Sequence, residues 1–180
     1  MLAHYDHLGM MGDIMYPGAN DNASGISLLL NLAKYYTGKK NKYTMLFMCF
    51  GAEEIGLLGS KYFTENPVFD LHGIKFLINL DIVGTGEEGL AIVNAKNQKK
   101  HVKWMIRINK KRKLFKKIKL RGQAPNSDHF WFGHHDVPAV FLYTLGGVSH
   151  YHDPLDRSET LMMTKTEQLM DLIINFFENF

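Results

Sequence analysis

The chain has 180 residues, of which 46% are hydrophobic and 22% charged, and this composition predicts a single domain over 1–180 with a core of its own. It contains no apolar run long enough to cross a bilayer and no signal peptide, which excludes a membrane-spanning helix. One cysteine, Cys49, excludes an intramolecular disulfide, and its apolar neighbours predict a buried, unreactive thiol.

Short apolar runs alternate with amphipathic segments along the chain. In chain order, the expected strands are 1–4, 43–50, 74–80, 89–93 and 138–143, and the expected helices are 22–37, 58–65, 97–112 and a final segment that opens near 164. The strand runs are continuously apolar, which is typical of strands covered on both faces of a mainly parallel sheet. The pattern predicts an α/β fold, a three-layer α/β/α sandwich with a mixed, mostly parallel sheet.

Charge is unevenly distributed along the chain. Between Lys99 and Arg121 there are twelve Lys or Arg and no Asp or Glu, which leaves nine basic against eighteen acidic residues elsewhere. Val102, Met105 and Ile106 recur at helical spacing in this segment, which favours the solvated face of a helix that packs on the core. A surface that binds a polyanion is the alternative.

The final helix has a start signal in the sequence. Thr164 and Glu167 match a capping box, in which the two side chains bond each other's backbone N–H groups. Apolar residues recur on one face behind it, at Leu169, Leu172, Ile173, Phe176 and Phe177. This face is expected to pack against the sheet.

Five short polar clusters interrupt the chain, and most of them follow expected strands. They are HYDH (4–7), ANDNAS (19–24), EE (53–54), NLD (79–81) and SHYHD (149–153). In sheets of this class, ligands bind beyond the carboxyl ends of the strands. The groups in these clusters, among them His4, Asp21, the Glu53–Glu54 pair and Asp81, are therefore expected to converge on one edge.

Converging carboxylates need a counter-charge, because a buried unpaired acid is costly or takes up a proton. Mixed histidine and carboxylate ligands suit zinc. Five candidate ligands are too many for one tetrahedral ion with an open position. Two metal ions that share a bridging carboxylate fit better than one.

Each candidate also has an ordinary structural explanation without a metal. These are a helix cap for Asp21, a strand end for His4, a turn for Asp81, and an ion pair with Asp153 or Asp156 for His152. The Glu53–Glu54 pair is hardest to explain in this way, since surface solvation fits poorly with its apolar setting.

With these motifs the chain resembles the co-catalytic dizinc aminopeptidases. That family includes secreted bacterial leucyl aminopeptidases and glutamate carboxypeptidases, with glutaminyl cyclases as one-zinc relatives. The matching motifs are AHYDHLG (3–9), GANDNASG (18–25), GAEEIGLLGS (51–60), NLDIVG (79–84), SDHFWF (127–132), GHHDVPAVF (133–141) and YHDPLD (151–156). They occur in the family's order and spacing and cover nearly the whole chain, which implies the phosphorylase/hydrolase-like fold of zinc exopeptidases.

The resemblance implies two Zn²⁺ per chain, with Mn²⁺ or Co²⁺ as substitutes. The implied ligands are His4 and Asp81 for the first metal, Glu54 and His152 for the second, and Asp21 as the bridge between them. Asp6 matches an acid that orients His4 from behind. His150 is an alternative to His152, which the YH-x-P-x-D context favours.

The same resemblance implies a reaction. Glu53 matches the general base, which takes a proton from the activated water and passes it to the leaving amine. Tyr151 matches a hydroxyl that steadies the developing oxyanion, and Asp128 and His129 match a motif that supports the pocket without binding metal. The implied substrate is a peptide with a free N-terminus, because one metal can hold its α-amine.

One departure from the family concerns the start of the chain. Family domains begin well upstream of the HYD motif with further strands of the sheet, whereas three residues precede it here. The resemblance therefore predicts that this chain lacks N-terminal edge strands. It also predicts that the full-length protein is exported, to the periplasm or the outside of the cell.

Two other functions remain as alternatives. A one-zinc acyltransferase like the glutaminyl cyclases would keep equivalents of Asp21, Glu53, Glu54 and His152. A non-catalytic, metal-stabilised module would bind polyanions through the basic segment 99–121, although a structural site needs no base such as Glu53. No nucleic-acid partner and no membrane span are expected, and the motifs do not separate an aminopeptidase from a carboxypeptidase.

Overall fold

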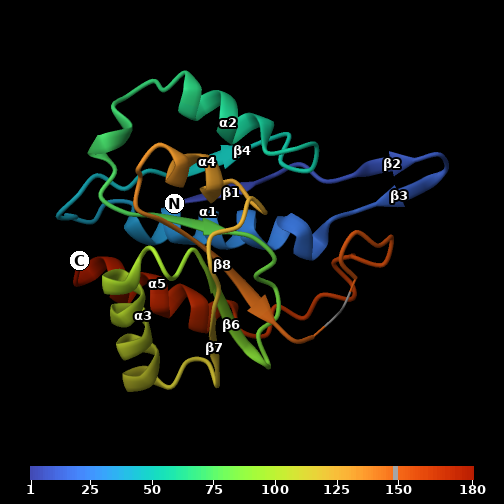
Figure 1. Ribbon diagram of the computed structural model, residues 1–180. Helices are drawn as coiled ribbons and strands as arrows, with labels where there is room; N and C mark the ends of the chain where they lie inside the picture. Colours follow the sequence, from blue (N-terminus) through green and yellow to red (C-terminus); the bar gives the residue numbers. More distant parts are fainter. Residues whose placement is uncertain (148–149) are drawn as a thin grey trace.

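The computed structural model describes residues 1–147 and 150–180, and its centre is a six-stranded sheet (Figure 1). Its strand order is β4 (Met48–Phe50), β1 (Leu2–His4), β5 (Leu77–Leu80), β8 (Ala139–Leu145), β6 (Gly89–Val93) and β7 (Ile118–Leu120). All neighbouring strands are parallel except β6 and β8, which are antiparallel. The prediction of a mixed, mostly parallel sheet is confirmed.

Helices cover both faces of this sheet. One face packs against α1 (Ser24–Tyr36), α3 (Lys99–Arg112) and α5 (Thr166–Glu178), and the other against α2 (Leu58–Glu65) and α4 (His129–His134). Figure 1 shows α2 and α4 on one side of the strands and α3 and α5 on the other. Strand β8 serves both layers, since Val140 and Leu142 join the first core while Ala139 joins the second. The three-layer arrangement is therefore present.

Strand β4 corrects two expectations. The run 43–50 was expected to be a doubly buried strand, but only Met48–Phe50 is a strand, and it lies at the edge of the sheet. Cys49 is exposed, so the prediction of a buried thiol is wrong. An edge strand has one hydrogen-bonded neighbour, and here only Phe50 of the three residues is buried.

The start of α5 corrects a third expectation. The helix begins at Thr166, Lys165 precedes it, and no side chain caps it. The hydroxyl of Thr164 instead donates a hydrogen bond to the carboxylate of Glu87. The capping box is therefore absent, because a partner from a distant segment takes the hydroxyl that would have served as the cap.

Several elements escaped the sequence analysis. They are β7, α4, the short helical turn η2 (Leu71–Gly73), and a hairpin formed by β2 (Gly9–Met11) and β3 (Ile14–Tyr16). The hairpin extends away from the sheet in Figure 1, and its residues are largely exposed. A strand that lies outside the core carries no burial pattern, which is the signal that strand prediction uses.

The basic helix α3 packs as expected on one side only. Val102, Met105 and Ile108 are buried in the core, whereas Ile106 is half-buried. The Lys and Arg residues of the helix are exposed. Within the described residues, no helix combines the length and the apolar character that crossing a bilayer would require.

Candidate metal centre

The polar clusters of the sequence converge where four parallel strands end. His4 is the last residue of β1, the glutamate pair follows β4, and Asp81 directly follows β5. Asp21 lies in the short helical segment η1 (Ala19–Ala23), and His152 lies in the loop after β8. Ser149, the first residue of the SHYHD cluster, lies outside the described residues.

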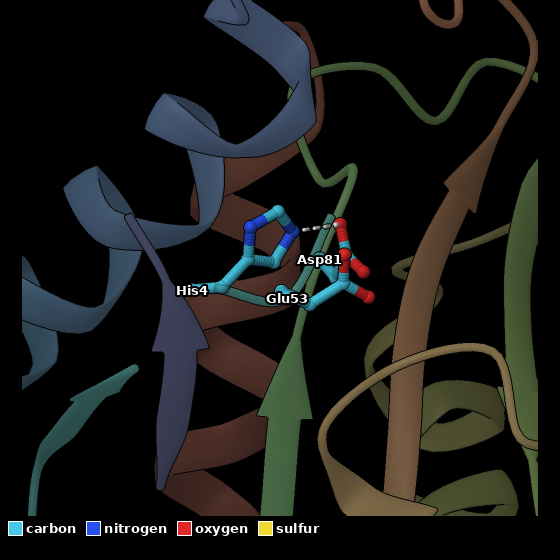
Figure 2. Close-up of side chains that lie close together, drawn as sticks. All are labelled: His4, Glu53 and Asp81. Atoms are coloured by element: carbon cyan, nitrogen blue, oxygen red, sulfur yellow. Dashed lines mark ion pairs between the residues drawn. The ribbon is translucent and has the colours of Figure 1, made fainter. Parts of the chain in front are cut away.

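The first group of side chains surrounds His4. Its Nε2 atom lies 3.3 Å from Asp21 Oδ1 and 3.3 Å from Asp81 Oδ1. Figure 2 shows His4, Glu53 and Asp81 pointing toward one another, and the ligand atoms of these three lie within 4.8 Å. This group is nearly closed to solvent, since His4 is fully buried and Asp81 is 4% exposed.

The second group lies on the other side of Asp21. His152 Nε2 lies 3.4 Å from Asp21 Oδ2 and 3.0 Å from Glu54 Oε2. Asp21 therefore turns one carboxylate oxygen to each group. It does not cap α1, which follows Ala23 without a side-chain cap. Nor does His152 pair with Asp153 or Asp156, because its Nε2 faces the site.

The geometry and the unpaired atoms fit two divalent cations. Ligand atoms of a tetrahedral zinc site with bonds of about 2.0–2.1 Å lie about 3.3 Å apart. The contacts between His4, Asp21 and Asp81 match this spacing. Among the described residues, His4 Nε2 and Asp81 Oδ1 face each other at 3.3 Å but are buried without a well-aligned hydrogen-bond partner, as expected for atoms whose partner is a metal.

His7 is a member of the site that the sequence analysis did not assign. Its Nδ1 atom lies 2.7 Å from Glu54 Oε1, and His7, Asp21 and Glu54 place ligand atoms within 4.8 Å of one another. Burial lowers the pKa of His7, but contact with Glu54 raises it above its ordinary value overall. The sequence could have indicated His7 as a site residue, because it belongs to the same HYDH cluster as His4.

Asp6 supports both groups from behind. His4 Nδ1 lies 3.1 Å from the backbone carbonyl oxygen of Asp6 and 3.5 Å from its carboxylate. A proton on Nδ1 would leave Nε2 free to bind a metal. The other carboxylate oxygen of Asp6 accepts a hydrogen bond from the backbone N–H of Glu54 at 3.2 Å.

Two further supports were not predicted. The buried carboxylate of Asp156 accepts backbone N–H groups from Asn20 at 2.8 Å and Asp21 at 3.0 Å. Ser127 donates its hydroxyl proton to Asp81 Oδ2 at 2.8 Å and accepts from Asn79 at 2.6 Å. Both contacts hold carboxylates that face the metal positions, and each joins segments far apart in the chain.

The surroundings of Glu53 favour the protonated form of its carboxyl group. Burial raises the pKa of its carboxyl group to about 8, with Asp81, Asp128 and Glu54 adding to the rise and His4 opposing it. In the metal-free protein, burial alone would lower the pKa of His4, and the carboxylates of Asp21 and Asp81 raise it to about 12. The cluster thus retains protons that divalent cations would displace.

The remaining predicted residues surround these groups. Asp128 and His129 are buried, and neither belongs to the groups of facing ligand atoms. Burial raises the pKa of Asp128 to about 6 and lowers that of His129 to about 4, so His129 is neutral. Tyr151 is exposed, and its ring stacks on His152 with centroids 3.9 Å apart.

A cavity of about 200 Å³ opens beside the first group. Its walls are formed by Asp21, Glu53, Asp81, Ile82, Arg121, Asn126, Phe141, Tyr143 and Tyr151. A larger cavity of about 650 Å³ lies near the starts of β1 and β5, at the opposite end of these strands, and contacts none of the clustered acids. Because two of the candidate ligands, Asp21 and Asp81, line the smaller cavity together with Glu53, it is the one suited to hold a substrate.

The sequence of this chain is similar to those of known proteins. Residues 1–177 match the family described as Peptidase family M28. Aminopeptidase YwaD of Bacillus subtilis is 31% identical over 180 residues, which cover 95% of this chain and 38% of that protein. The chain thus spans well under half of the length of this curated relative.

Solved structures give the same fold. BSAP, a zinc aminopeptidase from Bacillus subtilis, has a TM-score of 0.81 at 29% identity, over 97% of this chain and 44% of that chain. A glutaminyl cyclase from an Acidobacteriales bacterium has a TM-score of 0.83 at 19% identity, over 98% and 67% of the two chains, a likeness of fold alone. With a family match that covers all but the last three residues, this chain belongs to peptidase family M28.

Proposed function

We propose that this chain carries the catalytic site of a zinc-dependent aminopeptidase that removes the N-terminal residue from peptides. The observation that supports this proposal most directly is the orientation of Asp21. Its two carboxylate oxygens face two separate groups of ligand atoms. A one-metal site would need no such bridge. Membership of peptidase family M28 and the similarity to aminopeptidase YwaD support the same activity.

The metal-binding roles follow from the two groups. One zinc would be held by His4, Asp81 and Asp21, and the other by Asp21, Glu54 and His152, with His7 beside Glu54. Zinc ions bound there supply Lewis-acid chemistry, lowering the pKa of water and polarising a carbonyl oxygen. The protein supplies the ligands, their orientation and the exclusion of bulk water.

Glu53 would act as the general base. Its carboxylate lies beside the first group and lines the cavity, where an attacking water and a peptide carbonyl would meet. It would accept a proton from that water as the C–O bond forms, and then donate the proton to the amine as the C–N bond breaks. Burial disfavours its charged form and so makes Glu53 a stronger proton acceptor than a solvated glutamate in the same electrostatic field, whereas bound zinc would act in the opposite direction.

An acidic cavity also suits a free N-terminus. Asp21, Glu53 and Asp81 line the cavity, and their carboxylate oxygens can accept hydrogen bonds from an α-amine. This feature favours an exopeptidase that recognises the amino end of the substrate. Tyr151, at the cavity rim beside His152, is positioned to contact a substrate oxygen.

The test combines metal analysis with kinetics on the Glu53→Gln variant. The variant should retain about two zinc ions per chain, while kcat for leucine p-nitroanilide falls by a factor of about 100 or more. Glu159→Gln, an exposed glutamate in a surface loop, is the matched control and should behave like the wild type. Unchanged turnover in Glu53→Gln would exclude its role as base, and one zinc per chain with cyclisation of N-terminal glutamine would indicate a cyclase instead.

A further inference from the structure

One cation faces the candidate metal centre across the cavity. Arg121 lines the cavity together with the three acids Asp21, Glu53 and Asp81, and it is the only basic residue among the described residues of its wall. The sequence placed Arg121 merely at the end of the basic segment 99–121. The fold separates it from the exposed lysines of that segment and turns it toward the site.

The side chain is fixed by strand β8. Its Nη1 atom donates a hydrogen bond to the hydroxyl of Tyr143 at 2.9 Å. Tyr143 and Phe141 alternate along β8 and therefore project to the same face of the sheet, where both line the cavity. The backbone N–H of Arg121 donates to Ile92 at 2.8 Å, which anchors the residue to the neighbouring strand β6. Arg121 is thus half-buried, with its backbone held by β6 and its guanidinium held by Tyr143 of β8.

Most N–H donors of the Arg121 guanidinium have no hydrogen-bond partner among the described residues. An arginine side chain offers five N–H donors, and the structure pairs one of them, with Tyr143. Within residues 1–147 and 150–180, no carboxylate lies in ion-pair distance of Arg121, whereas Arg112 on the same segment pairs with Asp171. A half-buried guanidinium without a counter-ion is suited to bind an anionic group of a ligand.

The charge balance sharpens this point. Four carboxylates surround the two candidate metal positions, those of Asp21, Glu53, Glu54 and Asp81. Two divalent cations would engage these carboxylates and so leave the guanidinium of Arg121, which makes no ion pair among the described residues, available to an anionic group of a ligand. The cavity volume of about 200 Å³ equals roughly seven water molecules at about 30 Å³ each, which is enough for one amino-acid residue of a substrate.

We propose that Arg121 and Tyr143 form a carboxylate-binding subsite that makes the site selective for anionic peptide substrates. The proposal rests on the proposed peptidase function. The carboxylate would come either from the side chain of an N-terminal Asp or Glu or from the α-carboxylate of a very short peptide. Ile82 and Phe141 would contact the aliphatic part of the substrate, and the guanidinium would form paired hydrogen bonds with the carboxylate.

The test uses binding to the zinc-loaded protein, so that it does not depend on turnover. Isothermal titration compares glutamic acid α-amide with glutamine α-amide, which differ in the side-chain carboxylate, and leucine with leucine amide, which differ in the α-carboxylate. At least one pair should differ by about tenfold or more in favour of the acid. Arg121→Ala should abolish the difference, and Arg121→Lys and Tyr143→Phe should each reduce it.

Lys119→Ala is the matched control, because Lys119 is an exposed residue two positions earlier on β7 and should leave the preference unchanged. The kcat/KM ratio for glutamyl over glutaminyl p-nitroanilide gives a second measure of the side-chain arm. Equal binding within each pair, or a preference that survives in Arg121→Ala, would overturn the subsite. Failure of the wild type to hydrolyse any of the leucyl, glutamyl and glutaminyl p-nitroanilides would instead count against the proposed function, and the binding result would be judged separately.

Discussion

Asp156 offers the sharpest test of how the bridging carboxylate is held. Its two carboxylate oxygens accept the backbone N–H groups of Asn20 and Asp21, at 2.8 and 3.0 Å, in a position that is 3% exposed. Hydrogen bonds to a charged acceptor contribute about 1.5–3 kcal/mol each. Asp156→Ala removes both, so the free energy of unfolding should fall by about 3 kcal/mol or more. Asp156→Asn keeps one acceptor oxygen and should lose roughly half of that.

Zinc affinity should fall as well, because Asp21 loses the contacts that fix its backbone. Loss of a contact behind a metal ligand commonly weakens binding about 10–100-fold. Denaturant unfolding in the presence of chelator measures the free energy of unfolding, and zinc titration against a competing chelator then measures zinc affinity. Asp13→Asn at the exposed hairpin turn is the control for loss of one negative charge. If Asp156→Ala costs less than about 1 kcal/mol and binds zinc like the wild type, the positioning argument is wrong.

Two other predictions concern the metals and pH. Asp21→Asn should weaken binding of both zinc ions together, and direct metal titration showing loss of only one would contradict a bridging role. In chelator, the melting temperature of the wild type should fall relative to that of Glu53→Gln as pH rises from about 5 to about 8, because the folded-state pKa of Glu53, about 8, lies above its ordinary 4.5. The comparison with Glu53→Gln cancels the contributions of His129 and the N-terminal amine, whose lowered pKa values act in the opposite direction. The lowered pKa of Glu54 acts below this range. Zinc should reverse the trend, since its ligands must be deprotonated; scanning calorimetry that shows the metal-free wild type gaining stability relative to Glu53→Gln would refute the assignment.

The sequence alone predicted the features of the site that depend on the local order of residues along the chain. A buried strand followed at once by an acid, as at Asp81, tells which end of the sheet carries the chemistry, because parallel strands present the same end to one edge. Helix α2 and strand β6 lie where the sequence predicted them, since each has a strong local pattern. Spacing and residue type therefore sufficed to select His4 and Asp21 as neighbours in space.

Other features depend on which segments pack together, and no local pattern specifies that. Cys49 is exposed because β4 lies at an edge, and Thr164 bonds Glu87 from another segment instead of capping α5. Asp156 was considered as a partner for His152 but supports the backbone of Asp21, 135 residues away. Arg121 belongs to a basic run in the sequence, and only the pairing of β7 with β6 and the contact with Tyr143 turn it toward the acids. The positions of these residues are decided by burial and by pairing between distant segments, which depend on the fold of the whole chain.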